Sequence, residues 1–202
     1  MDGRSSPLRF IQWSNLLSYA SLAAWLLAAH AAVSGGSWSG AGAWIALAAL
    51  VDMYDGKFAR LFRRGPDQNA FGTEIDSLVD VVAFGAGPVV CVVALVPPAP
   101  GVQRGALLVA ALVYLISTVT RLGFFNIVSH GTGGFIGVPT TIAGLLWSTL
   151  FLMEPGSIVV TVGLVITGAL MVLPVPIPRP GGWRFLLFPA WAVGLAVLHA
   201  LR

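Results

Sequence analysis

Long apolar runs recur along this chain from one end to the other, and they leave few folds open to it. Of its 202 residues, 57% are hydrophobic and only 9% are charged. Soluble domains carry about a quarter charged residues, so these side chains could not cover a water-facing surface. We therefore predict an all-α, polytopic transmembrane helical bundle of about six to eight spans, with residues 1–202 as a single integral membrane domain.

Turn-forming glycines and prolines divide the apolar sequence into seven segments. The fifth segment is shorter than the ~20 residues that a span needs, so we expect it to lean on its neighbours. Pro88 is expected to kink the third segment by removing a backbone hydrogen bond. The predicted spans are residues 12–33, 39–61, 74–96, 105–128, 139–153, 157–175 and 183–201.

The basic residues predict how such a bundle is oriented. With seven spans, only Arg104 and Arg202 fall on one side of the membrane. Cytoplasmic loops carry the excess of lysine and arginine, so the other side is predicted to be the cytoplasm, at the cytoplasmic (inner) membrane. The net charge of +3 is scattered beside apolar spans, which suits anionic lipid and not nucleic acid. The predicted cytoplasmic residues are Arg4, Arg9, Lys57, Arg60, Arg63, Arg64, Arg121, Arg179 and Arg184.

Six of the eight acidic residues lie between Asp52 and Asp80. Asp52 and Asp55 are three positions apart at the end of the second segment, so they point the same way from a helix. Asp76 and Asp80 are four positions apart at the start of the third segment and share one helix face. Because the connection between these segments lets them run antiparallel, we expect the two pairs of carboxylates to converge.

Four carboxylates near hydrocarbon are not stable as bare anions. Each costs about 2.5 to 3.5 kcal/mol at a helix centre, and their mutual repulsion adds to this. Ligands that offer only oxygen indicate a hard ion such as Mg²⁺, Mn²⁺ or Ca²⁺, and Mg²⁺ commonly binds carboxylates together with substrate phosphates. The alternative is a proton relay or an ion-coupled transporter without enzymatic activity, although coupling-ion sites usually lie near the midplane on broken helices.

Small residues accompany the aspartates. Gly56, Ala59 and Gly72 leave room for a planar or phosphate-bearing group against the backbone. The complete string resembles the signature of the CDP-alcohol phosphotransferase family at every position, on signature helices within residues 39–96. It reads Asp52-x2-Asp55-Gly56-x2-Ala59-Arg60-x11-Gly72-x3-Asp76-x3-Asp80.

The resemblance implies a catalytic domain with two divalent ions, Mg²⁺ or Mn²⁺, with Ca²⁺ as a further candidate. An alcohol would attack the β-phosphorus of a CDP-activated lipid and release CMP, with the metals stabilising charge on the attacking and leaving oxygens. Asp80 would be both a metal ligand and the general base. The other implied metal ligands are Asp52, Asp55 and Asp76. The implied contacts with the CDP group are Asn15, Asp52, Gly56, Ala59, Arg60, Gly72 and Asp76.

Two further stretches, residues 81–88 and 134–141, resemble the phosphatidylserine synthases within this family. The resemblance implies L-serine as the acceptor and CDP-diacylglycerol as the donor, giving phosphatidylserine and CMP. Arg121 would bind the acceptor carboxylate, and Asn126 would complete the acceptor site. Phe124 departs from the pattern, because those synthases commonly carry an arginine there.

The alternative acceptors are glycerol 3-phosphate and inositol phosphate, which would require more than one basic residue. Arg63, Arg64 and Arg121 are the candidates for that role. Arg63 and Arg64 are otherwise expected to anchor the chain at lipid headgroups. The resemblance also implies a homodimer, and the basic residues predict that the active site faces the cytoplasm.

Overall fold

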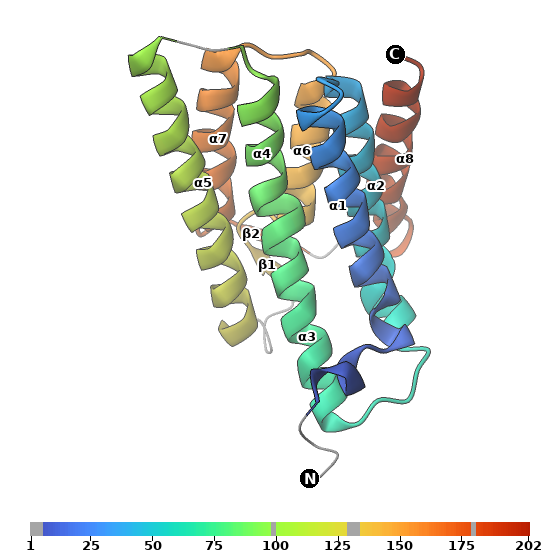
Figure 1. The fold of residues 1–202 in the computed structure, drawn as a ribbon. Helices are drawn as coiled ribbons and strands as arrows, with labels where there is room; N and C mark the ends of the chain where they lie inside the picture. Colours follow the sequence, from blue (N-terminus) through green and yellow to red (C-terminus); the bar gives the residue numbers. More distant parts are fainter. Residues whose placement is uncertain (1–5, 98–99, 129–133, 179–180) are drawn as a thin grey trace.

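The computed structural model describes residues 6–97, 100–128, 134–178 and 181–202. In these ranges the chain is a bundle of helices, and a single pair of three-residue strands is the only sheet (Figure 1). The prediction of an all-α membrane protein is confirmed. Arg4 and Arg179, which contributed to the predicted orientation, lie outside the described residues.

The described helices correspond to the seven predicted segments, and the third predicted segment contains the end of α3 and all of α4. Their bounds are α1 (Leu16–Val33), α2 (Trp38–Ala59), α3 (Pro66–Asp80), α4 (Gly87–Leu95), α5 (Gly101–Val128), α6 (Thr140–Phe151), α7 (Ser157–Val172) and α8 (Leu187–Ala200). Short helical turns η1 (Pro7–Phe10), η2 (Trp13–Asn15) and η5 (Gly182–Leu186) precede α1 and α8.

Three helical stretches of the described residues are long and apolar enough to cross a membrane. They are Trp13–Val33, Pro66–Leu95 and Gly101–Val128, and α6, α7 and α8 are shorter apolar helices beside them. Large apolar side chains on the outer faces of α5 and α7, such as Leu112 and Ile166, are exposed, as lipid-facing side chains would be. The exact number of spans stays a prediction.

Helix α2 is surrounded by other helices of the bundle. It packs against α1, α6 and α8. The contact with α1 is made largely by buried small residues, including Ala28, Ala32 and Ala41. Small side chains let helix backbones approach closely, which is the usual way that helices associate inside a membrane. This packing fixes the end of α2 that carries Asp52 and Asp55.

Helix α3 begins earlier than the apolar pattern predicted. The polar stretch before residue 74 is also helical, because Pro66 suits a first turn and the Gln68 side chain accepts a 2.9 Å hydrogen bond from the Gly65 N–H. As a result α3 extends beyond the rest of the bundle at the end where the N-terminal segment lies (Figure 1). Phe10 stacks on Phe71 there, with ring centroids 4.7 Å apart.

A π-helical segment, η3 (Val81–Ala86), joins α3 to α4 directly after Asp80. In a regular helix the N–H of residue 88 would donate to the Phe84 carbonyl, but Pro88 has no N–H. The buried Tyr114 hydroxyl donates to that carbonyl instead, at 2.6 Å. The turn before Pro88 is π-helical, a feature often found next to functional sites, and the kink itself stays a prediction.

The sequence did not reveal the strand pair β1 (Gly134–Ile136) and β2 (Pro176–Pro178). The two strands are antiparallel, and Phe135 pairs with Ile177. They join the segment before α6 to the segment after α7, so the start of α6 is fixed relative to the rest of the bundle.

Candidate active site

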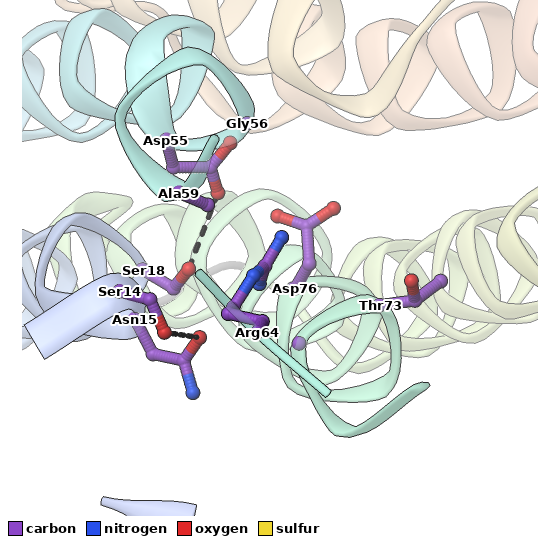
Figure 2. Close-up of a pocket in the computed structure, with 10 residues that line it drawn as sticks. Ser14, Asn15, Ser18, Asp55, Gly56, Ala59, Arg64, Thr73 and Asp76 are labelled. Atoms are coloured by element: carbon purple, nitrogen blue, oxygen red, sulfur yellow. Dashed lines mark hydrogen bonds between the residues drawn. The ribbon is translucent and has the colours of Figure 1, made fainter. Parts of the chain in front are cut away.

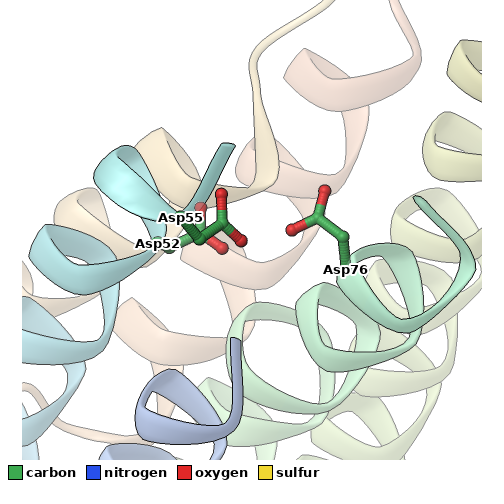
Figure 3. Close-up of side chains that lie close together, drawn as sticks. All are labelled: Asp52, Asp55 and Asp76. Atoms are coloured by element: carbon green, nitrogen blue, oxygen red, sulfur yellow. The ribbon is translucent and has the colours of Figure 1, made fainter. Parts of the chain in front are cut away.

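The aspartates of α2 and α3 meet at one site. Asp52, Asp55 and Asp76 each offer a carboxylate oxygen, and these oxygens all lie within 4.8 Å of one another. Figure 3 shows the Asp76 side chain pointing across from α3 toward the two side chains from α2. Asp80 lies one turn further along α3, where its side chain is only 8% exposed. Helical spacing within each pair, together with the antiparallel path of α2 and α3, produces this convergence.

Hydroxyl groups from other helices hold these carboxylates. Ser18 donates to Asp55 Oδ2 at 3.2 Å, from α1. Thr140 donates to Asp80 Oδ2 at 2.8 Å and Thr141 donates to Asp52 Oδ2 at 2.7 Å, both from the start of α6. Because these are the first residues of α6, the positive end of that helix also lies at the carboxylates.

No lysine or arginine of the described residues forms an ion pair with the four aspartates. The ion pair that the described residues do contain joins Arg9 of η1 to Asp67 in the first turn of α3, 3.7 Å apart and outside the cluster. Several carboxylates crowded at the edge of hydrocarbon must be protonated, paired with cations or bound to metal. Their donor atoms are all oxygen, which fits a hard divalent cation such as Mg²⁺, Mn²⁺ or Ca²⁺.

A polar pocket opens beside the aspartates (Figure 2). It lies between η2 and the start of α1, the end of α2 and the second half of α3. Small and polar side chains form its walls, so a nucleotide or phosphate group could lie close to the backbone. The lining residues are Ser14, Asn15, Ser18, Asp55, Gly56, Ala59, Arg64, Gly72, Thr73 and Asp76.

Most of the residues expected to contact a CDP group line this pocket. They are Asn15, Gly56, Ala59, Gly72 and Asp76, while Asp52 belongs to the adjacent acidic group that could hold a metal ion. Arg60 differs from the others. It is exposed at the C-terminal cap of α2 and is not among the lining residues.

Arg64 takes a position that the sequence did not indicate. We expected it to anchor the chain at lipid headgroups, yet its side chain is partly buried and reaches into the space between Asn15 and Asp76 (Figure 2). A Cβ atom at Gly72 would lie 2.6 Å from Arg64 Nη1, so the glycine makes room for the guanidinium. Gly72, a residue of the signature, therefore makes room for Arg64, which lies four residues after Arg60.

Arg121, on α5, lies on the Asp80 side of the cluster. It is 6% exposed, and it is attracted electrostatically by Asp80 and Asp52. Its guanidinium lies 5.0 Å from the Phe125 ring centroid, and its Nε has no hydrogen-bond partner among the described residues. Asp80 Oδ1 is likewise buried and without a partner there. Two buried groups of opposite charge thus retain free hydrogen-bonding capacity at the same place.

Asn126 and Phe124, which belong to the same predicted acceptor region, are placed differently. Asn126 exchanges hydrogen bonds with Ser77, its amide donating at 2.9 Å, and so links α5 to α3. Phe124 is 43% exposed on the surface of α5. The structure therefore brings Arg121 close to the aspartates, whereas Asn126 lies next to α3 through Ser77 and outside the polar pocket.

A second, apolar pocket adjoins the cluster through Thr141, whose hydroxyl is bonded to Asp52. The Lys57 ammonium lies nearby, 3.6 Å from the centroid of the Phe185 ring that helps to form this pocket. Sequence reasoning did not predict this pocket, because its walls come from α2, β1, β2, α6 and the region before α8. The lining residues are Met53, Phe135, Val138, Pro139, Thr141, Ile142, Ile177, Phe185 and Phe188.

Three residues of the site were missed as functional residues. Ser18, Thr140 and Thr141 contact the aspartates through their hydroxyls. The stretch 134–141 is the sequence signal that includes the threonines, and its resemblance to one group of the family assigns no contact to them. Hydroxyl residues are common in membrane helices, so their types alone do not indicate a site.

Comparisons with known proteins agree with this geometry. The chain is 34% identical over 106 residues to the archaetidylserine synthase of Methanothermobacter thermautotrophicus, an alignment that covers 52% of this chain and 43% of that protein. It is 36% identical over 106 residues to a CDP-diacylglycerol–serine O-phosphatidyltransferase of Helicobacter pylori, covering 51% of this chain and 42% of the relative. Both alignments thus span less than half the length of these curated relatives.

A longer alignment extends the similarity over most of the chain. A CDP-diacylglycerol–serine O-phosphatidyltransferase of Methanocaldococcus jannaschii is 26% identical over 154 residues, covering 76% of this chain and 71% of the relative. Residues 11–177 match the sequence profile of CDP-alcohol phosphatidyltransferases, a range that contains the four aspartates, the polar pocket and both threonines. The chain belongs to the CDP-alcohol phosphatidyltransferase family.

Proposed function

We propose that this chain transfers a phosphatidyl group from CDP-diacylglycerol to the hydroxyl of L-serine, forming phosphatidylserine and releasing CMP. The observation that carries the proposal is the meeting of Asp52, Asp55 and Asp76 beside a polar pocket lined by the small residues of the family signature. The relatives named as serine phosphatidyltransferases support the choice of serine.

The two adjoining pockets suit the two parts of the donor. In the polar pocket, Asn15 and Arg64 would contact the CDP group, with Arg64 as a cation for the diphosphate. The apolar pocket that shares Thr141 with the cluster would receive the apolar part of the lipid. The diphosphate would then lie at the aspartates, where the two pockets adjoin.

Asp52, Asp55 and Asp76 would hold the divalent ions, Mg²⁺ or Mn²⁺, and Asp80 is also proposed as a ligand. Such ions, when bound, would offset the charge of the diphosphate and of the oxygens that gain charge during transfer. That two ions bind remains an expectation of the family resemblance.

Asp80 and Arg121 are proposed to act on the acceptor. The serine hydroxyl would give its proton to Asp80 Oδ1, which has no other partner among the described residues. The serine carboxylate would bind Arg121, whose Nε also lacks a partner there. Asn126 is retained as an acceptor residue only through its contact with Ser77, next to Asp76.

The alternative acceptors require a second phosphate-binding cation on the Asp80 side. Arg63 is exposed, and Arg64 lines the pocket assigned to the donor. This arrangement favours serine over glycerol 3-phosphate and inositol phosphate. We further propose that the site faces the cytoplasm at the inner membrane and that the chain forms a homodimer, which the mass of the protein in nanodiscs would test.

An acceptor panel tests the proposed reaction. Purified protein in nanodiscs would receive CDP-diacylglycerol, Mg²⁺ or Mn²⁺ and one of serine, glycerol 3-phosphate, inositol, inositol phosphate or choline. We expect CMP release and phosphatidylserine formation with serine alone. Faster turnover with another acceptor would overturn the choice of serine. An absence of CMP with every acceptor would overturn the enzymatic proposal and leave the ion-coupled transporter as the alternative.

A further inference from the structure

Two consecutive threonines tie the aspartates of two different helices to the start of α6. Thr140 donates to Asp80 on α3, and Thr141 donates to Asp52 on α2, at 2.8 and 2.7 Å. The partners are 60 and 89 residues apart in sequence. Hydrogen bonds from a hydroxyl to a carboxylate are short and strong when the acceptor is charged. The first turn of α6 therefore binds one carboxylate of α3 and one carboxylate of α2.

The segment before α6 is fixed by its own contacts, so the threonines are not free to drift. The Gly137 N–H donates to the Val175 carbonyl and the Val138 N–H to the Leu170 carbonyl, both at 2.9 Å. Gly137 has a φ of +72°, and a Cβ atom there would collide with the Met171 carbonyl oxygen. Only glycine fits this position, which connects β1 to α6 against the end of α7.

The hydrogen bond from Thr140 leaves the two oxygens of Asp80 in different states. Oδ2 accepts from Thr140, whereas Oδ1 is buried without a partner among the described residues. Thr140 is itself only 1% exposed, and a buried β-branched side chain has few rotamers. Thr140 thus restrains the carboxylate through Oδ2 and leaves Oδ1 as the oxygen without a hydrogen-bond partner among the described residues.

We propose that Thr140 and Thr141 are positioning residues. Thr140 orients Asp80 so that Oδ1 faces the acceptor hydroxyl, and Thr141 orients the Asp52 carboxylate toward the position of a divalent ion. The part played by Thr140 rests on the proposed transfer reaction, whereas the part played by Thr141 requires only that the aspartates bind a divalent cation.

Steady-state kinetics of Thr140→Val and Thr140→Ser test the first half. Valine keeps the shape and removes the hydroxyl, so we expect kcat to fall about 10- to 100-fold, while KM for CDP-diacylglycerol changes less than about twofold. Serine keeps the hydroxyl and should restore kcat to within about threefold of the wild type, on the same orientation argument. A loss in Thr140→Ser as large as that in Thr140→Val would show that the hydroxyl alone does not maintain the rate and would overturn the proposal for Thr140.

Binding of Mn²⁺, measured by the electron paramagnetic resonance of the free ion, tests the second half without any turnover. Loss of a group that orients a metal ligand weakens binding about 10- to 100-fold, so Thr141→Val should show this loss and Thr141→Ser should not. Unchanged Mn²⁺ affinity in Thr141→Val would overturn the assignment. This result is separable from a failure of the proposed reaction, because no lipid substrate or acceptor is present.

Thr149→Val is the matched control. Thr149 lies on the same helix, and its hydroxyl donates to the Leu145 carbonyl of its own helix at 2.8 Å. The substitution should leave both kcat and Mn²⁺ affinity unchanged. Losses in Thr149→Val equal to those in the other two valine variants would attribute the effects to α6 as a whole and contradict the proposal.

Discussion

Asp80 differs from the other aspartates in its surroundings. It is the most buried of the four, it accepts a hydrogen bond from Thr140, and it lies near the positive charge of Arg121. Asp52, Asp55 and Asp76 are only partly buried and face one another. At the scale of the residue, this contrast supports the added role of proton acceptor for Asp80, which is also a proposed ion ligand.

Asp80→Asn should lower the rate of CMP release at least about 100-fold, because an amide cannot accept the acceptor proton. The amide oxygen can still accept from Thr140, so binding of CDP-diacylglycerol should remain close to that of the wild type. Asp67→Asn, at an exposed position of the same helix, is the control and should keep full activity. Wild-type turnover in Asp80→Asn would remove Asp80 from the role of base.

Arg64→Ala should raise KM for CDP-diacylglycerol about 10- to 100-fold, because the diphosphate would lose a charge-assisted hydrogen bond. Arg60→Ala and Arg63→Ala remove neighbouring exposed cations and should have effects below about threefold on the same scale. The three variants are compared by KM at saturating serine. A large effect in Arg60→Ala with a small one in Arg64→Ala would return the phosphate role to the arginine of the signature.

At the scale of the element, the continuous helical stretch of α3, η3 and α4 contains one replaced backbone hydrogen bond. Tyr114 supplies the hydrogen-bond donor that Pro88 lacks. The π segment η3 lies between Asp80 and Pro88. Gly144 admits the Phe84 ring of this segment, since a Cβ there would lie 2.6 Å from the ring. Helix α3, at the start of this stretch, carries both Asp76 and Asp80, and Thr140 of α6 donates a hydrogen bond to Asp80.

Tyr114→Phe would leave the Phe84 carbonyl buried without a donor, at a cost of about 1 to 3 kcal/mol. We expect a lower thermal midpoint of the protein in detergent, followed by the fluorescence of its tryptophans. Tyr19→Phe, at a partly buried site, is the control and should keep the wild-type midpoint. An unchanged midpoint in Tyr114→Phe would mean that another group satisfies the carbonyl.

The sequence was sufficient to predict what depends on local spacing. Asp52 and Asp55, like Asp76 and Asp80, share a helix face through their separation alone, and the short connection makes α2 and α3 antiparallel. The start of α3 was misplaced because its first turns are polar and have no apolar period, although Pro66 offered a local sign of it.

The contacts that the sequence did not reveal are those made over long separations. Thr140 and Thr141 reach the aspartates only because β1 pairs with β2 and Gly137 packs on the end of α7. Short strands with prolines leave no alternating pattern to detect. Arg64 enters the polar pocket because α2 ends at Ala59 and the chain then turns back toward Gly72, and the spacing of residue types does not report such a turn.

At the scale of the molecule, the two ends of the described chain lie at opposite ends of the bundle (Figure 1). The N-terminal segment packs on α3 at the end toward which α2 carries its aspartates. Arg63 lies in the connection between α2 and α3, whereas Arg104 lies at the start of α5. The basic connection between α2 and α3 thus lies at one end of the bundle and Arg104 at the other, as the predicted orientation requires.

Cysteine accessibility tests this orientation in cells. The native Cys91 is buried, so a membrane-impermeant maleimide should not label the wild-type protein. We expect Arg104→Cys to be labelled in intact cells and Arg63→Cys only after the cells are opened, since both positions are exposed. The reverse pattern would place the aspartates on the outer side and contradict the proposed cytoplasmic site.

The central claim is that the aspartates of α2 and α3 hold divalent ions that make transfer from a CDP-activated lipid feasible. Its most direct test is CMP release from CDP-diacylglycerol and L-serine by the purified protein, measured after chelation with EDTA and again during titration with Mg²⁺ or Mn²⁺. The account predicts no release in EDTA and a saturable return of activity with either ion, which Asp55→Asn should abolish. Undiminished release in EDTA, or full metal-dependent activity in Asp55→Asn, would contradict it.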